Sequence, residues 1–373
     1  MIPRSAGDDR AELLEWFAGN LRERMLARGH RLVEPTAPGA AADREDGLED
    51  GVALHPVDVR SPRGYRRRSR AIFVVGLGVA DEAPPRPLET GYPLLLRSLA
   101  NLFVLVVRTG RHRAGPEAYF FTLEQGYFAV PYAGDDDSFF GAVLERVAPL
   151  ATSRLVIGNE FCPDLPPELW EGDEQTAAIE RAGRRLAALD LLPAPFPLQE
   201  FLSPEDFRHV LQLFGIGGLS YGNISARKDE QRFWMSASGV DKNCLRTVGR
   251  DILLVTGCDL ERRAILVSVP PHVQPRRVSV DAVEHLTIYR EHPAVGAILH
   301  VHAWMDGVPS TAVNYPCGTL ELAQAVAGLV REAPDPTRAV VGLKNHGLTV
   351  TGPSLDEIFA RVEGRILRQV PMG

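Results

Sequence analysis

Apolar and polar positions change period several times along the N-terminal half of the chain. Some segments repeat apolar residues at helical spacing and others form short continuous apolar runs, which predict helices and buried strands respectively. Helices are expected at 11–28, 92–102 and 138–150, and extended segments at 72–75, 103–107, 119–130 and 154–157. Alternation of helices with strands predicts an α/β domain in which helices pack on a sheet.

A proline-rich segment separates this region from the rest of the chain. Residues 192–197 are Leu-Pro-Ala-Pro-Phe-Pro, and each proline fixes φ and removes an amide donor, so neither helix nor strand is favoured. At 373 residues the chain also exceeds the usual size of a single domain. We therefore predict a separate N-terminal α/β domain at 1–192, a linker at 193–202 and a C-terminal domain at 203–373.

Two segments of the N-terminal domain bear on its role. The segment 35–51 is rich in Ala, Gly, Asp and Glu and lacks periodicity, which predicts a loop. The sequence Gly-Leu-Gly at 76–78 follows a predicted strand, as in turns that bind the pyrophosphate of a dinucleotide. The third glycine of that motif is missing, and prolines stand where its helix would begin. The sequence therefore favours no nucleotide site and does not indicate what this domain does.

Composition argues against several classes of protein. A net charge of −7 is unfavourable for nucleic-acid binding, and we interpret the one local basic run, at 60–70, as solvated surface or a subunit contact. No apolar stretch approaches the roughly 20 residues that a membrane span requires. The chain begins without a secretory signal pattern, and no two of its four cysteines have the Cys-x-x-Cys spacing. We expect a cytoplasmic protein with reduced thiols and with neither nucleic acid nor membrane as a partner.

The most informative chemistry is a pair of histidines at the end of an apolar run. His300 and His302 follow the run 294–299. Side chains two apart on a strand leave the sheet on the same face, so both imidazoles are placed to share a metal ion. Strand ends also carry histidines without catalytic roles, so the pair needs further ligands.

A third histidine stands in a glycine-marked turn downstream. His346 and Gly347 separate two strand-like runs, 339–343 and 348–350. The alternative is a turn histidine that caps a hairpin. Three neutral imidazoles that leave one coordination position open are typical of catalytic zinc, whereas structural sites usually have four protein ligands. The sequence therefore predicts that His300, His302 and His346 bind zinc or another divalent metal at a catalytic site.

At this point the motifs resemble a known family. Residues 201–372, a little under half of the chain, are similar to the class II aldolase/adducin family. The motifs, in family order, are Gly-Asn-Ile-Ser-Ala-Arg at 222–227, Ser-Ala-Ser-Gly-Val-Asp-Lys at 236–242, the segment 281–289, His-Val-His at 300–302 and Lys-Asn-His-Gly-Leu at 344–348. The resemblance implies an α/β/α domain with a central sheet, a divalent metal, a small-molecule substrate and a homo-oligomer, either a tetramer or a dimer.

The resemblance also implies an acid beside the metal. Asp281 lies where the family's sugar-phosphate aldolases have a glutamate that acts as acid and base, and where its epimerase branch has a metal-binding aspartate. The second acid of the epimerases has no clear equivalent, and no tyrosine follows Tyr315. The alternative for Asp281 is structural, since Ser279 is a suitable N-cap and an acid in the first turn favours a helix start.

An anion pocket is implied at four further positions, which are Asn223, Ser238, Gly239 and Ser279. Glycine turns let backbone amides approach a phosphate, and hydroxyl groups donate hydrogen bonds to it. Val280 replaces one of the family's two serines before the acid, and the segment between His302 and His346 is shorter than usual. The first departure weakens the case for phosphate specificity, and the second implies a changed substrate.

The function that we predict is a metal-dependent lyase of the class II aldolase type. The metal would stabilise the enediolate left by carbon–carbon cleavage of a hydroxy-carbonyl substrate, and Asp281 would move the proton. The same site would serve an epimerase, a dehydratase or a decarboxylase. A non-catalytic scaffold, as in the adducin branch, is the remaining alternative, and retention of all three histidines speaks against it.

Overall fold

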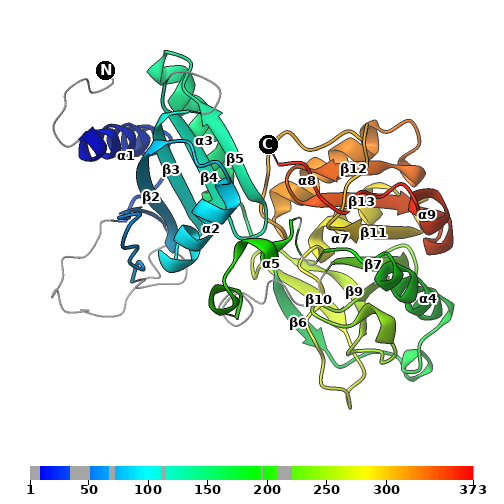
Figure 1. Cartoon of the computed structure of the whole chain (residues 1–373). Helices are drawn as coiled ribbons and strands as arrows, with labels where there is room; N and C mark the ends of the chain where they lie inside the picture. The colour runs from blue at the N-terminus through cyan, green and yellow to red at the C-terminus, as the bar shows by residue number, and fades with distance from the viewer. Residues whose placement is uncertain are drawn as a thin grey trace, which may run out of the picture. The chain divides into compact units, whose positions relative to one another are not determined.

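The computed structural model divides the chain into two compact units (Figure 1). It describes residues 9–33, 51–66, 72–110, 115–192, 194, 196–208 and 221–372. The first unit is Met1–Thr152 with Gln199–His209 and Met372–Gly373, and the second is Ser153–Leu198 with Val210–Pro371. Most of the loop predicted at 35–51 and the basic residues at 67, 68 and 70 lie outside the described residues.

The first unit contains a five-stranded mixed sheet in the order β1-β2-β3-β4-β5. The first three strands are parallel, and β4 and β5 follow as an antiparallel pair. Their bounds are β1 Gly51–Pro56, β2 Ile72–Glu82, β3 Leu102–Thr109, β4 Glu117–Thr122 and β5 Gly126–Pro131; the helices are α1 Asp9–Ala27, α2 Pro87–Arg97 and α3 Asp136–Thr152.

Helices cover both faces of this sheet, and β3 is apolar on both of its faces from Leu102 to Val107. Leu102, Val104 and Val106 belong to the core formed with α1 and α3. Phe103, on the opposite face, lies near Phe121, and the Phe121 ring packs against Gly91 of α2. The predicted α/β architecture of this unit is therefore confirmed.

The glycines at 76 and 78 lie inside β2 and not in a turn before a helix. A Cβ atom on either glycine would come within 2.8 Å of the Phe103 ring, so both positions are small because the ring packs on them. This placement removes the local geometry that a dinucleotide site requires.

Two expected elements lie at other positions than predicted. The helix expected at 92–102 is α2, which begins and ends five residues earlier, at Pro87 and Arg97. The strand expected at 154–157 is β6, which begins just after that range and spans Gly158–Cys162.

The second unit contains an eight-stranded sheet in the order β12-β13-β11-β7-β8-β9-β10-β6. All neighbours are antiparallel except β10 and β6, which are parallel. The remaining bounds are β7 Gly222–Arg227, β8 Phe233–Ser236, β9 Ile252–Asp259, β10 Ala264–Ser268, β11 Ala297–Val301, β12 Val340–Leu343 and β13 Gly347–Gly352.

Residues 153–192 belong to this second unit, so the division of the chain differs from the boundary predicted at 193–202. Strand β6 extends the second sheet by pairing with β10. Helix α4 (Glu174–Ala188) buries Ile179 and Leu186 in the core of the same unit. Both contacts join residues that are far apart in sequence. The composition of the segment around the prolines therefore could not predict them.

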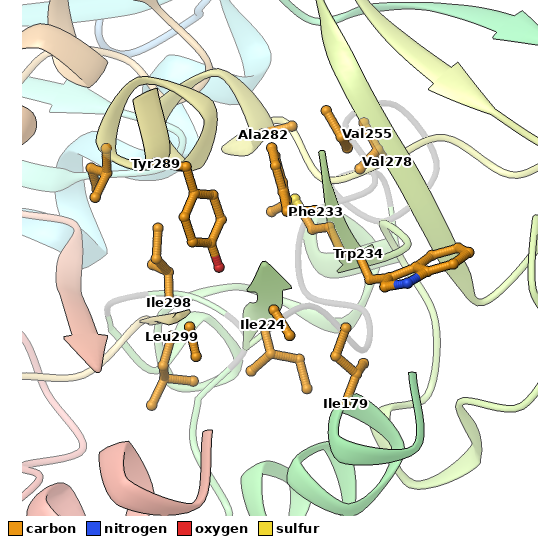
Figure 2. Close-up of a cluster of buried hydrophobic side chains, with 14 of the residues drawn as sticks. Ile179, Ile224, Phe233, Trp234, Val255, Val278, Ala282, Tyr289, Ile298 and Leu299 are labelled. Atoms are coloured by element: carbon orange, nitrogen blue, oxygen red, sulfur yellow. The ribbon is translucent and has the colours of Figure 1, made fainter. Parts of the chain in front are cut away.

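Helices cover both faces of the second sheet. Helix α4 packs with α9 (Leu355–Val362), and α7 (Ala282–Glu291) packs with α8 (Leu320–Glu332). Figure 2 shows Ile179 of α4 near Ile224 of β7, and Tyr289 of α7 beside Ile298 of β11. Positions 298 and 300 share one face of β11, so His300 lies on the side covered by α7. The α/β/α arrangement predicted for this part of the chain is confirmed.

Candidate metal and active site

The three histidines converge at one end of β11. His300 is in the strand, His302 directly follows its last residue, and His346 lies in the turn that joins β12 to β13. One ring nitrogen from each residue lies within 4.8 Å of the others. The ring centroids are 5.5 Å apart for His300 and His302, and 4.9 Å apart for each of the other two pairs.

Two glycines permit this convergence because they let neighbouring strands approach β11 closely. A Cβ atom at position 347 would lie 2.1 Å from the carbonyl oxygen of Val301, and one at position 222 would lie 2.3 Å from that of His300. Side chains at either position would push the strands apart. Gly347 follows His346 directly and therefore fixes how near the third imidazole comes to the other two.

Burial keeps two of the imidazoles neutral. His300 is fully buried and His346 is 3% exposed. Desolvation, followed by the neighbouring imidazoles, holds the pKa of each well below the usual value of 6.5. The Nε2 atoms of the two rings are 3.0 Å apart, so one of them donates to the other in the absence of a metal.

The donor set suits a divalent transition metal. Neutral imidazoles offer lone pairs without the cost of removing a proton, and the ring nitrogens of all three histidines lie within reach of one ion. Imidazole ligands suit zinc, copper, iron and nickel better than magnesium or calcium, which prefer oxygen. His302 is only half-buried, so the set has a partly exposed side.

Asp281 lies next to the histidines and is held by Asn223. The Asn223 amide donates to Asp281 Oδ2 over 2.7 Å, and Ser279 Oγ lies 3.3 Å from the same oxygen. Asp281 Oδ2 is 4.0 Å from His300 Nε2. Asp281 is 4% exposed, and its Oδ1 atom has no hydrogen-bond partner among the described residues. One carboxylate oxygen is thus fixed in place and the other remains available.

Asp281 lies at the start of a helix, as its structural alternative also expects, and its side chain points toward the histidines. Asp281 occupies the N-cap position of α7, but its side chain makes no capping hydrogen bond. The carboxyl group instead faces Asn223, Ser279 and His300. The helix start serves to aim the acid at the histidines.

The four residues assigned to an anion pocket fall into two pairs. Asn223 and Ser279 are buried and hydrogen-bonded to each other over 3.0 Å. Ser238 and Gly239 are exposed in a turn after β8, where Gly239 has a φ of +65°. A β-bridge between Ala237 and Val278 places this turn beside the Ser279 segment. The structure thus brings the two segments together. The side-chain amide of Asn223, however, donates a hydrogen bond to Asp281.

Cys317 is a site residue that the sequence did not single out. It is 9% exposed, and its Sγ atom lies 3.0 Å from His346 Nδ1 and 3.5 Å from His346 Nε2. Asp281, Cys317 and His346 form a second group whose ligand atoms lie within 4.8 Å of one another. Only the fold brings this cysteine to the histidines, because it stands in a loop without metal-ligand spacing.

Three further polar side chains pack behind the histidines. Glu284 and His285 extend from α7 toward the sheet, and Thr349 lies on β13. Burial raises the pKa of Glu284 to about 8 and lowers that of His285 to about 4. Their spacing from Asp281, three and four residues, places all three on one helix face. That spacing was the signal in the sequence that could have found Glu284.

A protein-family model matches part of the chain. Residues 207–311 match the family model described as Class II Aldolase and Adducin N-terminal domain. This part of the chain is similar to the class II aldolase and adducin family. The matched segment contains Asp281 and the His300 and His302 pair and ends before His346, so the third histidine joins the site through the pairing of β13 with β11.

Curated relatives of this chain carry two activities in their names. A methylthioribulose-1-phosphate dehydratase of Xylella fastidiosa is 33% identical, over 28% of this chain and 45% of that protein. One of Klebsiella pneumoniae is 26% identical, over 38% of this chain and 79% of that protein. An L-fuculose phosphate aldolase of Methanococcus vannielii is 31% identical, over 21% and 51%. The chain spans a little under half of the Xylella protein.

Solved structures include similar proteins. An L-fuculose-1-phosphate aldolase from Thermus thermophilus covers 50% of this chain and 85% of its own, with 20% identity and a TM-score of 0.31. YgbL from Klebsiella pneumoniae, titled a putative aldolase/epimerase/decarboxylase, covers 53% and 94%, with 18% identity and a TM-score of 0.33. No described helix is long and apolar enough to cross a membrane.

Proposed function

We propose that the second unit is a divalent-metal-dependent lyase that acts on a small hydroxy-carbonyl compound of the sugar-phosphate class. The observation that carries the proposal is the convergence of three imidazoles beside a buried carboxyl group. The phosphorylated substrates in the names of the dehydratase and aldolase relatives support the substrate class. We propose zinc as the metal, because a ligand set of imidazoles that leaves one position open is typical of catalytic zinc.

The residues divide the work between holding the metal and moving a proton. His300, His302 and His346 would hold the ion, which supplies Lewis-acid stabilisation of negative charge on substrate oxygens. Asp281 would exchange a proton with the substrate through Oδ1, since Oδ2 accepts the Asn223 amide. Asn223 and Ser279 would keep the carboxyl group in one orientation, which lowers the entropic cost of reaching a reactive geometry.

Aldol cleavage is the leading reaction and dehydration is the second candidate. In cleavage, a proton leaves the hydroxyl group on the carbon β to the carbonyl, and the bond between the α and β carbons breaks. In dehydration, a proton leaves the α carbon and the β hydroxyl departs as water. Both leave negative charge on oxygens beside the metal, so one site fits both. The dehydratase names of curated relatives favour the second.

Metal content and product identity together test the proposal. The purified chain is analysed for bound metal and then incubated with L-fuculose 1-phosphate and with methylthioribulose 1-phosphate, and the products are identified by NMR. We expect close to one equivalent of metal per chain and turnover of a phosphorylated hydroxy-carbonyl compound.

Two variants give the matched comparison. His302→Ala should remove the bound metal and the activity together, whereas His272→Ala, at an exposed position beside Trp170 in the same unit, should change neither. A wild-type chain that binds no metal even when zinc is supplied would reject the proposal and favour a scaffold. Formation of a dehydrated product alone would reject aldol cleavage and leave the dehydratase.

A further inference from the structure

A row of three polar side chains crosses the sheet at His300. In the antiparallel registers, His300 lies directly opposite Asn223 on β7 and directly opposite Thr349 on β13. Residues directly opposite each other in an antiparallel pair share a face, and here that face is the one covered by α7. Asn223 donates to Asp281 and Thr349 donates to Glu284, so α7 anchors both flanks of the histidine.

We propose that Thr349 and Glu284 are positioning residues that hold the His300 ring with its proton on Nδ1 and its Nε2 lone pair directed to the metal. This inference rests on the proposed metal site. The contacts that carry it are Thr349 Oγ1 at 3.3 Å from His300 Nδ1 and Glu284 Oε1 at 2.5 Å from Thr349 Oγ1.

The direction of these hydrogen bonds follows from counting protons. A neutral imidazole has one donor and one acceptor nitrogen, so a metal on Nε2 requires the proton on Nδ1. Thr349 must then accept that proton in a hydrogen bond and give its own hydroxyl proton to another acceptor. Glu284 Oε1 fills that role in both forms of the carboxyl group, because a proton, when present, can reside on Oε2.

Burial of the Glu284 carboxyl group has a free-energy cost. The side chain is 2% exposed, and its Oε2 atom has no hydrogen-bond partner among the described residues. Burying an acid with one satisfied oxygen is unfavourable, which is why burial displaces its pKa upward. The hydroxyl group of Thr349 is fully buried between the acid and the histidine. Outer partners of this kind fix the ring orientation of metal-binding histidines.

A second contact on the same strand limits the expected effect. The backbone of Leu348 also lies close enough to the His300 ring to raise the pKa of that ring. Loss of the Thr349 hydroxyl therefore leaves this contact in place. Substitution of outer partners typically weakens metal binding by about 10- to 100-fold, and we expect the lower end of that range here.

The test measures metal affinity in matched valine variants. Thr349→Val keeps the shape of the side chain and removes the hydroxyl group. Thr351→Val makes the same change two residues along the same strand, at an equally buried position whose hydroxyl group contacts Ala339 and Pro336 instead. Zinc titration of metal-stripped chains by calorimetry should show about 10-fold weaker binding for Thr349→Val and less than about 2-fold for Thr351→Val.

Three outcomes separate the possibilities. If the wild-type chain binds no zinc, the proposed function fails. If the wild-type chain binds zinc and both valine variants bind it equally well, the positioning role fails and the metal site stands. If Thr349→Val does not fold, the ¹⁵N shifts of His300 in the metal-free wild-type chain decide, since we expect the proton on Nδ1 and a proton on Nε2 would overturn the inference.

Discussion

Burial of Glu284 should make the second unit less stable as the pH rises from about 6.5 to 8. The pKa of Glu284 is 4.5 in an unfolded chain and is raised to about 8 by burial. Between these values the folded state holds a proton that the unfolded state has lost. Folding is therefore favoured at low pH, and this contribution is lost as the pH rises through the folded-state pKa.

Two other buried groups described in this unit have pKa shifts that act outside the pH window of Glu284. His285 has a pKa lowered to about 4, which makes stability rise with pH up to the unfolded value of 6.5. Lys242 has a pKa lowered to about 8, and its effect begins only above that value. One and a half pH units at about 1.4 kcal/mol each give a loss of about 2 kcal/mol, to order of magnitude.

The assay is urea unfolding of the metal-free chain at pH 6.5 and 8, followed by tryptophan fluorescence. Trp170, Trp234 and Trp304 lie in the second unit, and Trp16→Phe in every variant removes the signal of the first. Glu284→Gln should abolish most of the pH dependence, whereas Glu332→Gln, at an exposed position on α8, should keep it. A wild-type chain with the same free energy of unfolding at pH 6.5 and at pH 8 would refute the reasoning. So would a Glu284→Gln chain that lost as much stability between these pH values as the wild-type chain.

Three further substitutions test the site. Asp281→Asn should lower kcat by about 10² to 10⁴, as loss of an acid–base group does, with the metal content unchanged; a drop in metal content would make Asp281 a ligand instead. Gly347→Ala should lower the melting temperature and weaken metal binding, because its Cβ atom would lie 2.1 Å from the Val301 carbonyl, and an unchanged melting curve would contradict that contact. Cobalt-substituted protein should show no thiolate-to-metal absorption band, since an open site leaves Cys317 outside the ligands; a band that Cys317→Ser abolishes would mean a closed site.

Local sequence sufficed for the parts of the site that depend on neighbours along the chain. The apolar run before His300 determined a buried strand, and the two-residue spacing to His302 placed both rings on one side of it. The glycine after His346 marked a hairpin, which the structure confirms as β12 and β13. These features follow from backbone periodicity and turn chemistry, which act within a few residues.

The boundary between the two units was not available from local sequence. Prolines at 193–197 are a sound reason to expect irregular backbone, and yet β6 and α4, which precede them, join the second unit. Their assignment depends on pairing with β10 and on a core assembled from distant segments. The same limitation applies to the predicted oligomer, because an interface between copies depends on the folded surface.

The spacing of the histidines alone made them candidate metal ligands, whereas Asp281 and Asn223 became candidates through the resemblance of their motifs to the family. Only the order of strands decided that Asn223, His300 and Thr349 form one row, and only the docking of α7 set Asp281 and Glu284 against its two ends. Cys317 entered the site in the same way. Hydrogen-bonded partners that lie far apart in sequence produce no periodic pattern along the chain. They can therefore be identified only from the tertiary structure.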